Sequence, residues 1–286
     1  MDHHEPLDSL FRQAVSAIDA GDVIGLTRLL AIHPALLHDR LDSPGAWLRG
    51  KVGDALEGYF RQPCLLWFVA ENPVRNDRLP ENIAEVTRAI IRAAEREGVA
   101  NLQEQLTCTL GLVCTGRVAR ECGVQLELID VLIDAGAVPG TGTGALAAGN
   151  LAAAERLVER GGELTLAVAV CLGWTADAAR LASEASAGDR QIALAAAALN
   201  GNARALEMLI DLGVDLNAYS TGIHPHATAL HHAASSGSLD AVRVLVAAGA
   251  RLGTRDLVYQ ATPLGWAEYY RHHDIAAYLR ERGGQR

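Results

Sequence analysis

The sequence lacks an excess of basic residues: its 286 residues carry 25 Lys and Arg against 34 Asp and Glu, a formal net charge of −9. Binding along a phosphate backbone depends on clustered Lys and Arg, so this composition argues against a nucleic-acid partner and leaves only a local basic patch open. Aromatic residues are also few, at 5%, although half of the residues are hydrophobic and these are mainly Ala, Leu and Val. Small apolar side chains favour closely stacked helices over a thick core lined by a sheet.

Paired cysteines and long apolar runs are missing as well. Five cysteines with no Cys-x-x-Cys pair argue against a disulfide framework and a zinc ribbon, and favour buried thiols in a reducing compartment. The first residues show no basic segment followed by an apolar one, as a signal peptide would, and the longest apolar run, 192–199, is too short to cross a bilayer. We therefore expect a cytoplasmic chain without a membrane segment. The cysteines are Cys64, Cys108, Cys114, Cys122 and Cys171.

Motifs of the common catalytic machineries are absent too. The sequence has no Gly-x-Ser-x-Gly elbow, no His-Glu-x-x-His and no Walker loop. The run Gly-Thr-Gly-Thr-Gly at 140–144 resembles a phosphate loop, but the next residue is Ala145 and the run follows a predicted helix instead of a strand. A turn between two helices is the better interpretation. We predict that the chain is not an enzyme and uses no cofactor.

What the sequence does contain is a repeat. Glycines that end a predicted helix recur at Gly213, Gly249 and Gly283, separated by 36 and 34 residues. Farther towards the N-terminus, Gly136, Gly161 and Gly188 are only 25 and 27 residues apart. A fixed spacing of this size indicates stacked supersecondary units, and the shorter spacing leaves room for two helices but no long connecting finger.

Residues 227–250 show the motif of one unit: a helix, a turn at Gly237-Ser238, a second helix and a glycine stop. The motif resembles the ankyrin repeat, whose signature is Thr-Pro-Leu-His-x-Ala-Ala, and Thr262-Pro263-Leu264 opens a second copy in which Gly265 replaces the His. The resemblance implies an all-α fold, a helical solenoid of about eight stacked helix-turn-helix pairs with irregular inserts in the N-terminal half. The first copy matches the signature at Thr228, Leu230, His231, Ala233 and Ala234.

On this basis we predict a single repeat domain over residues 1–286. A first pair covers 7–32, an irregular insert 35–62, two long pairs with inserts 63–137, two short pairs 141–188 and three regular repeats 189–283. The resemblance is clear for 189–283, plausible for 7–32 and weak for 63–188, where another helical hairpin such as a HEAT or tetratricopeptide unit is an alternative. Missing fingers over 141–188 would leave a notch beside the binding face.

The resemblance implies a non-enzymatic scaffold that binds another protein through its concave face and finger loops. The variable position of the signature, which in ankyrin repeats often faces the groove, falls on His232 and Trp266. Large aromatic residues are the usual energetic anchors of interfaces. An alternative is that Trp266 and Tyr270 cover the core. The predicted partner-binding residues are His224, His226, His232, Tyr259, Trp266 and Tyr269.

Arg75 and Arg78 complete this predicted set. Both lie in a polar insert between two prolines, where a guanidinium can bind a carboxylate or a phosphate. The alternative, slightly preferred, is a loop whose charges are satisfied internally.

Four histidines within nine residues raise the hypothesis of a metal site. His231 and His232 are adjacent on a predicted helix, so their side chains diverge by roughly 100° and do not converge on one ion. The resemblance also implies a structural role for His231. We therefore predict no metal, and expect His272 and His273 to be solvated turn residues.

The sequence leaves two other functions open. One is a metal- or small-ligand-dependent enzyme, with its site near the central short repeats or at the 224–232 histidine cluster. The other is homo-oligomerisation through the apolar central units.

Overall fold

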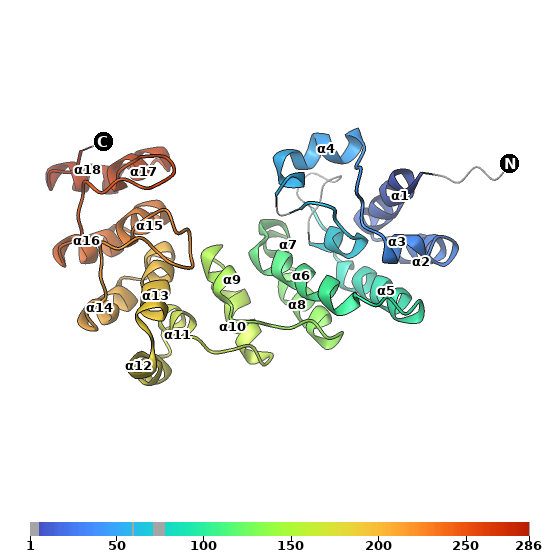
Figure 1. Cartoon of the computed structure of the whole chain (residues 1–286), viewed down its shortest axis with the longest axis horizontal. Helices are drawn as coiled ribbons and strands as arrows, with labels where there is room; N and C mark the ends of the chain where they lie inside the picture. Colours follow the sequence, from blue (N-terminus) through green and yellow to red (C-terminus); the bar gives the residue numbers. More distant parts are fainter. Residues whose placement is uncertain (1–5, 59, 71–77, 286) are drawn as a thin grey trace. The chain divides into compact units, whose positions relative to one another are not determined.

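The computed structural model describes residues 6–58, 60–70 and 78–285 (Figure 1). Over these ranges the chain forms helices and no β-strand, with one isolated bridge between Tyr219 and Thr228. The predicted all-α fold is confirmed. None of the helices described is long and apolar enough to cross a bilayer. The chain divides into two compact units: unit 1 runs to residue 140 and includes 159–161, and unit 2 comprises 141–158 and the residues from 162 onward.

Unit 1 begins with a helical hairpin that turns at Gly21, whose φ of 66° is the left-handed conformation that glycine adopts at low cost. The segment over 35–62, expected to be irregular, holds short helices tied back to α1, since Asp8 Oδ1 accepts hydrogen bonds from Gly45 N (2.7 Å) and Trp47 Nε1 (2.8 Å). The helices of this unit are α1 (Leu7–Ala20), α2 (Val23–Ile32), α3 (Ala35–His38), α4 (Ala46–Val52), η1 (Gly53–Leu56), η2 (Leu65–Val69), α5 (Ile83–Arg96), α6 (Leu102–Thr115), α7 (Arg117–Glu121) and α8 (Gln125–Asp134).

Unit 2 is a series of helix pairs. The first helices of successive pairs, α11, α13, α15 and α17, pack side by side, as do the second helices α14, α16 and α18 (Figure 1). The helices are α9 (Thr143–Ala147), α10 (Leu151–Glu159, which reaches residue 159 of unit 1), α11 (Leu166–Leu172), α12 (Thr175–Glu184), α13 (Ala187–Leu199), α14 (Ala203–Asp211), α15 (Ala229–Ser236), α16 (Leu239–Ala247), α17 (Pro263–Tyr269) and α18 (His273–Glu281).

The alanine content of the chain has a direct structural reason in α13. This helix packs against α11, α15 and α14, which cover it from residue 191 to its end. Residues 193–198, five Ala and one Leu, are all buried. Small side chains let neighbouring helices approach closely while they still remove apolar surface from water.

Polar side chains at the helix turns connect each pair to the one before it. Asn202 Nδ2 donates to the Cys171 carbonyl (3.2 Å), Ser238 Oγ donates to the Gly201 carbonyl (3.0 Å), and His272 Nε2 lies 3.2 Å from the Ser235 carbonyl. The expectation that His272 is a solvated turn residue was wrong: it is half-buried in this contact, whereas His273 is exposed. These turns therefore form a second line of contacts between repeats beside the apolar one.

Candidate functional site

A pocket of about 510 Å³ lies in the C-terminal repeats of unit 2. Its lining brings together six of the eight residues that the sequence pointed to, from two finger loops and two first helices. Their role in binding stays a prediction, but their convergence on one concave surface is a property of the structure. The six are His224, His226, His232, Tyr259, Trp266 and Tyr269, and Leu199, Ser235, Ala261, Gly265 and Tyr270 complete the lining.

Repeat geometry explains why these residues meet. His232 on α15 and Trp266 on α17 occupy the same position in consecutive repeats, and their ring centroids lie 6.1 Å apart. The His226 ring, from the loop before α15, lies 5.8 Å from Trp266 and 5.9 Å from Tyr259. On the far side, Tyr270 lies 6.3 Å from Trp266. Trp266 is therefore the centre of a cluster of rings, and such pairs add packing energy beyond the area they bury.

His231 is bonded at both ring nitrogens. Its Nδ1 accepts from Thr228 N (3.2 Å) in a capping arrangement at the start of α15, and its Nε2 lies 3.1 Å from the Ala261 carbonyl. This network places the proton on Nε2. Burial lowers the pKa of His231 below its usual value. His231 thus ties its own helix to the next finger loop, in agreement with the structural role that the resemblance implied.

His232 is the opposite case. It is fully buried, and neither of its ring nitrogens has a hydrogen-bond partner among the described residues. Burial, with smaller contributions from the neighbouring His224, His231 and His226, lowers its pKa to about 3. The ring is therefore neutral at ordinary pH, with one N–H donor and one acceptor nitrogen unused.

Asp256 organises the finger loop beside the pocket. Burial alone would raise its pKa, but hydrogen bonds from Tyr259 N, Trp266 Nε1, Ala261 N and Val258 N hold the pKa below its usual value. The indole bond measures 3.0 Å, so one buried carboxylate fixes both the loop and the central ring of the pocket. Asp256 is not among the residues predicted from the sequence. The sequence feature that could have indicated this role is an Asp placed before a turn, with a helix that starts at Thr-Pro after the turn.

The rim of the pocket exposes large apolar side chains. Tyr259 and Tyr269 are 72% and 81% exposed, and Leu257 and Val258 at the loop tip are 56% and 61% exposed. Exposed apolar groups collected on one surface mark an interaction site more often than isolated ones do. We call this set, with Tyr270, the apolar rim.

The two predicted arginines do not belong to this pocket. Arg75 lies outside the described residues. Arg78 is exposed in unit 1, next to the buried Leu79, and is absent from the pocket lining.

The histidine cluster was also a candidate metal site. His224 lies 6.3 Å from His226 and 5.9 Å from His232 between ring centroids. Over the described ranges, no three or more His, Cys, Asp or Glu side chains are placed to hold a metal ion.

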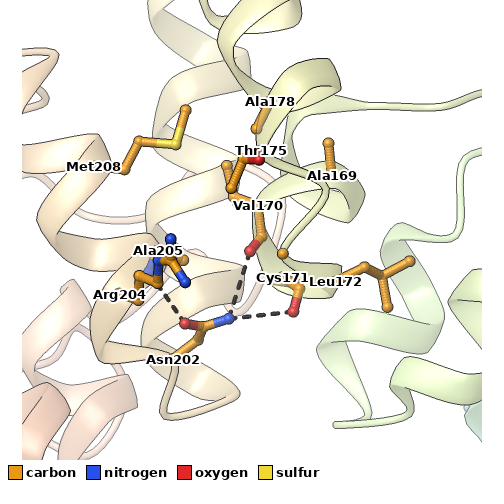
Figure 2. A pocket seen from close by; sticks show the side chains of 11 residues that line it. Ala169, Val170, Cys171, Leu172, Thr175, Ala178, Asn202, Arg204, Ala205 and Met208 are labelled. Carbon is orange, nitrogen blue, oxygen red and sulfur yellow. Dashed lines mark hydrogen bonds between the residues drawn. The ribbon is translucent and has the colours of Figure 1, made fainter.

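The central short repeats contain a separate pocket of about 220 Å³ (Figure 2). Figure 2 shows the Asn202 amide directed at the carbonyls of Val170 and Cys171, and its oxygen accepts from Ala205 N, so the amide is fully engaged. Burial raises the pKa of the Cys171 thiol to about 12, which removes it as a nucleophile near neutral pH. The lining contains no His, Asp or Glu.

A second pocket of the short repeats, of about 420 Å³, is lined by Glu163, Glu184 and Asp189 among apolar residues. Asp189 accepts from Ser186 N (3.1 Å) and Ser186 Oγ (2.7 Å), and these bonds lower its pKa. Asp189 therefore serves a capping box at the start of α13. The lining also contains three threonines, but no His, Cys or Lys.

Two human proteins resemble part of the chain. Cyclin-dependent kinase inhibitor 2A is 38% identical over 84 residues, which cover 29% of this chain and 52% of that protein. Cyclin-dependent kinase 4 inhibitor B is also 38% identical over 84 residues, 29% of this chain and 59% of that protein. The chain thus spans little more than half the length of either relative.

The family model for ankyrin repeats (three copies) matches residues 118–256 and, in an overlapping match, 194–285. The first match begins well before the repeats that show the Thr-Pro-Leu-His signature. It includes residues 118–188, where only the spacing of the predicted helices and their terminal glycines supported the resemblance. Together the matches cover more than half of the sequence. The chain belongs to the ankyrin-repeat family.

Proposed function

We propose that the chain is a non-enzymatic scaffold that holds another protein against the pocket and apolar rim of its C-terminal repeats. The observation that carries the proposal is the convergence of His224, His226, His232, Tyr259, Trp266 and Tyr269 on one pocket. A concave, aromatic surface with an exposed apolar edge has the composition of an interface centre.

The properties of the wider molecule support a protein as the partner. The net charge of −9 disfavours a nucleic acid. The two human relatives are named as inhibitors of cyclin-dependent kinases, and so as proteins that act on another protein. Proteins with the same fold have many different functions, so the partner of this chain is inferred from its own surface and not from the partners of the two relatives.

The linings of the two pockets described for the short repeats support the non-enzymatic part of the proposal, because one has no carboxylate or imidazole and the other pairs its carboxylates with no His, Cys or Lys. Near neutral pH the thiol of Cys171 is protonated, Asn202 is fully hydrogen-bonded, and Asp189 caps a helix. General acid-base chemistry needs a titratable group that is free to exchange a proton with a substrate.

Affinity capture with the full chain as bait tests this function. In a lysate of the cells that produce the protein, a Trp266→Ala/Tyr269→Ala variant should retain its partner at least about tenfold less than wild type, because interface anchors contribute more than about 1 kcal/mol each. Helical circular dichroism should be unchanged.

The matched control is Ile24→Ala/Ile32→Ala, which removes two exposed apolar side chains (66% and 70%) from unit 1. This variant should capture the partner as wild type does. Equal capture by wild type and the Trp266/Tyr269 variant would contradict the proposal, and loss of helicity in that variant would show that the two residues belong to the core.

A further inference from the structure

The pocket is walled by rings and carries no charged side chain. Its lining contains no Asp, Glu, Lys or Arg. The nearby carboxylate of Asp256 already accepts four N–H groups. A phosphate or a carboxylate entering this space would lose water without gaining a counter-charge, which is costly. A quaternary ammonium packs well against aromatic rings but offers no hydrogen bond to the imidazoles of the pocket. The pocket therefore suits a neutral, planar group that can form hydrogen bonds.

Beneath these rings lie polar atoms without partners. His226 Nε2 and both ring nitrogens of His232 are buried, and none of them makes a hydrogen bond with any residue that the structure describes. Each buried nitrogen left without a partner costs free energy that a suitable group would recover. A neutral imidazole offers one donor and one acceptor nitrogen, so a group that can either donate or accept pairs with whichever nitrogen it meets.

The ring of His224 borders both of these imidazoles. Its exposed ring lies 5.9 Å from His232 and 6.3 Å from His226, and its backbone has a φ of 40°.

Resting on the proposed function, we propose that this pocket binds a tyrosine side chain of the partner, whose ring packs on Trp266 and whose hydroxyl hydrogen-bonds to His226 or His232. Tyrosine combines an uncharged aromatic ring with a group that donates and accepts. Phenylalanine offers no hydrogen bond, and the tryptophan indole only donates. The apolar rim then contacts the residues that flank the tyrosine.

The test is a titration of the full chain, followed by NMR, with two neutral probes, N-acetyl-tyrosinamide and N-acetyl-phenylalaninamide. Wild type should bind the tyrosine probe about fivefold more tightly, the value of one net hydrogen bond. A His232→Phe variant, which keeps a ring in place, should reduce this preference. The control His273→Phe replaces an exposed histidine outside the pocket and should keep the wild-type preference.

Equal binding of the two probes by wild type would overturn the proposal, as would no binding of either. Tighter binding of N-acetyl-trimethyl-lysinamide or N-acetyl-phosphotyrosinamide would replace it with a charged ligand. If the tyrosine probe fails while the Trp266/Tyr269 variant still loses the partner, only this inference is wrong. If the probe binds while that variant captures normally, the proposed function is wrong instead.

Discussion

Two adjacent histidines show how much a single position in a helix decides. His231 satisfies both ring nitrogens and joins α15 to the next finger loop, whereas His232, one residue on, satisfies neither. Successive side chains on a helix point roughly 100° apart, so neighbours in sequence enter different surroundings. One ring serves the stack of repeats and the other belongs to the pocket.

The buried, neutral His232 predicts a loss of stability in acid. Its pKa falls from 6.5 in the unfolded chain to about 3 when folded, so between these values the unfolded chain binds more protons. This contribution to stability is complete above about pH 6.5 and is lost as the pH falls below it. At about pH 5 the expected loss from His232 is about 2 kcal/mol, at about 1.4 kcal/mol per pH unit. Urea unfolding at about pH 7 and about pH 5 measures it.

A His232→Phe variant separates this effect from general acid sensitivity. Phenylalanine preserves the ring contacts and removes two buried nitrogens without partners, so the variant should fold with nearly unchanged stability near neutral pH. Its acid-induced loss should be smaller than that of wild type by about 2 kcal/mol, and the remainder belongs in part to His231, whose pKa is also lowered. Equal losses in the two proteins would show that His232 is not the titrating group. The groups around it are His224, His226 and His231.

At the scale of an element, the finger loop before α17 depends on one side chain. The Asp256 carboxylate accepts from Val258 N (2.9 Å), Tyr259 N (2.6 Å) and Ala261 N (3.0 Å), besides the Trp266 indole. These bonds shape a loop whose tip is apolar and would otherwise collapse onto the protein. A buried acid thus holds exposed apolar residues in place.

Asp256→Asn should loosen this loop. The amide nitrogen would face N–H donors where a carboxylate oxygen now accepts, which costs about 2 kcal/mol or more. Hydrogen exchange of the Val258, Tyr259 and Ala261 amides should accelerate, and the unfolding midpoint should fall. Asp240→Asn, at a side chain that is 80% exposed, is the control and should change neither quantity appreciably. Unchanged exchange in Asp256→Asn would mean that the backbone alone shapes the loop.

The sequence predicts those contacts that follow from the spacing of the repeats, and it does not predict those that depend on the backbone conformation of a loop. The signature sets the register of the C-terminal repeats, and register alone places His232 beside Trp266, 34 residues apart. The contacts of Asp256 and His272 were missed because they depend on loop backbone conformation, which helical periodicity does not encode. The short helices over 35–62 were not predicted either. They are held by hydrogen bonds to Asp8, which lies in a helix distant in the sequence, and periodicity within 35–62 does not show such contacts.

At the scale of the whole molecule, stability in a repeat protein is a sum over neighbours. In unit 2, the first helices α11, α13, α15 and α17 pack on the first helices of adjacent repeats and on their own partners. The last pair closes the series with α18, which buries Ile275, Ala276 and Leu279 and exposes charged residues outward. Nothing in this pattern requires a distant segment of the chain.

A fragment of residues 141–286 should therefore fold alone. We expect helical circular dichroism in proportion to its helices and a cooperative urea transition, because the contacts of unit 2 lie within it. The binding of N-acetyl-tyrosinamide should match that of the full chain. A fragment without a cooperative transition would show that unit 1 is needed for folding, and would favour the single domain over residues 1–286 that the sequence predicted.

The hydrogen bond between the Trp266 indole and Asp256 has a consequence for spectroscopy. Trp266 is one of four tryptophans in the chain, and it combines a lining position, a charged acceptor and several neighbouring imidazoles. Indole emission responds in wavelength and intensity to nearby charge, to exposure and to quenching groups. Any occupant that excludes water from this ring or shifts the loop on which its acceptor lies will change that emission, so the chain contains an intrinsic fluorophore that reports occupancy of this pocket.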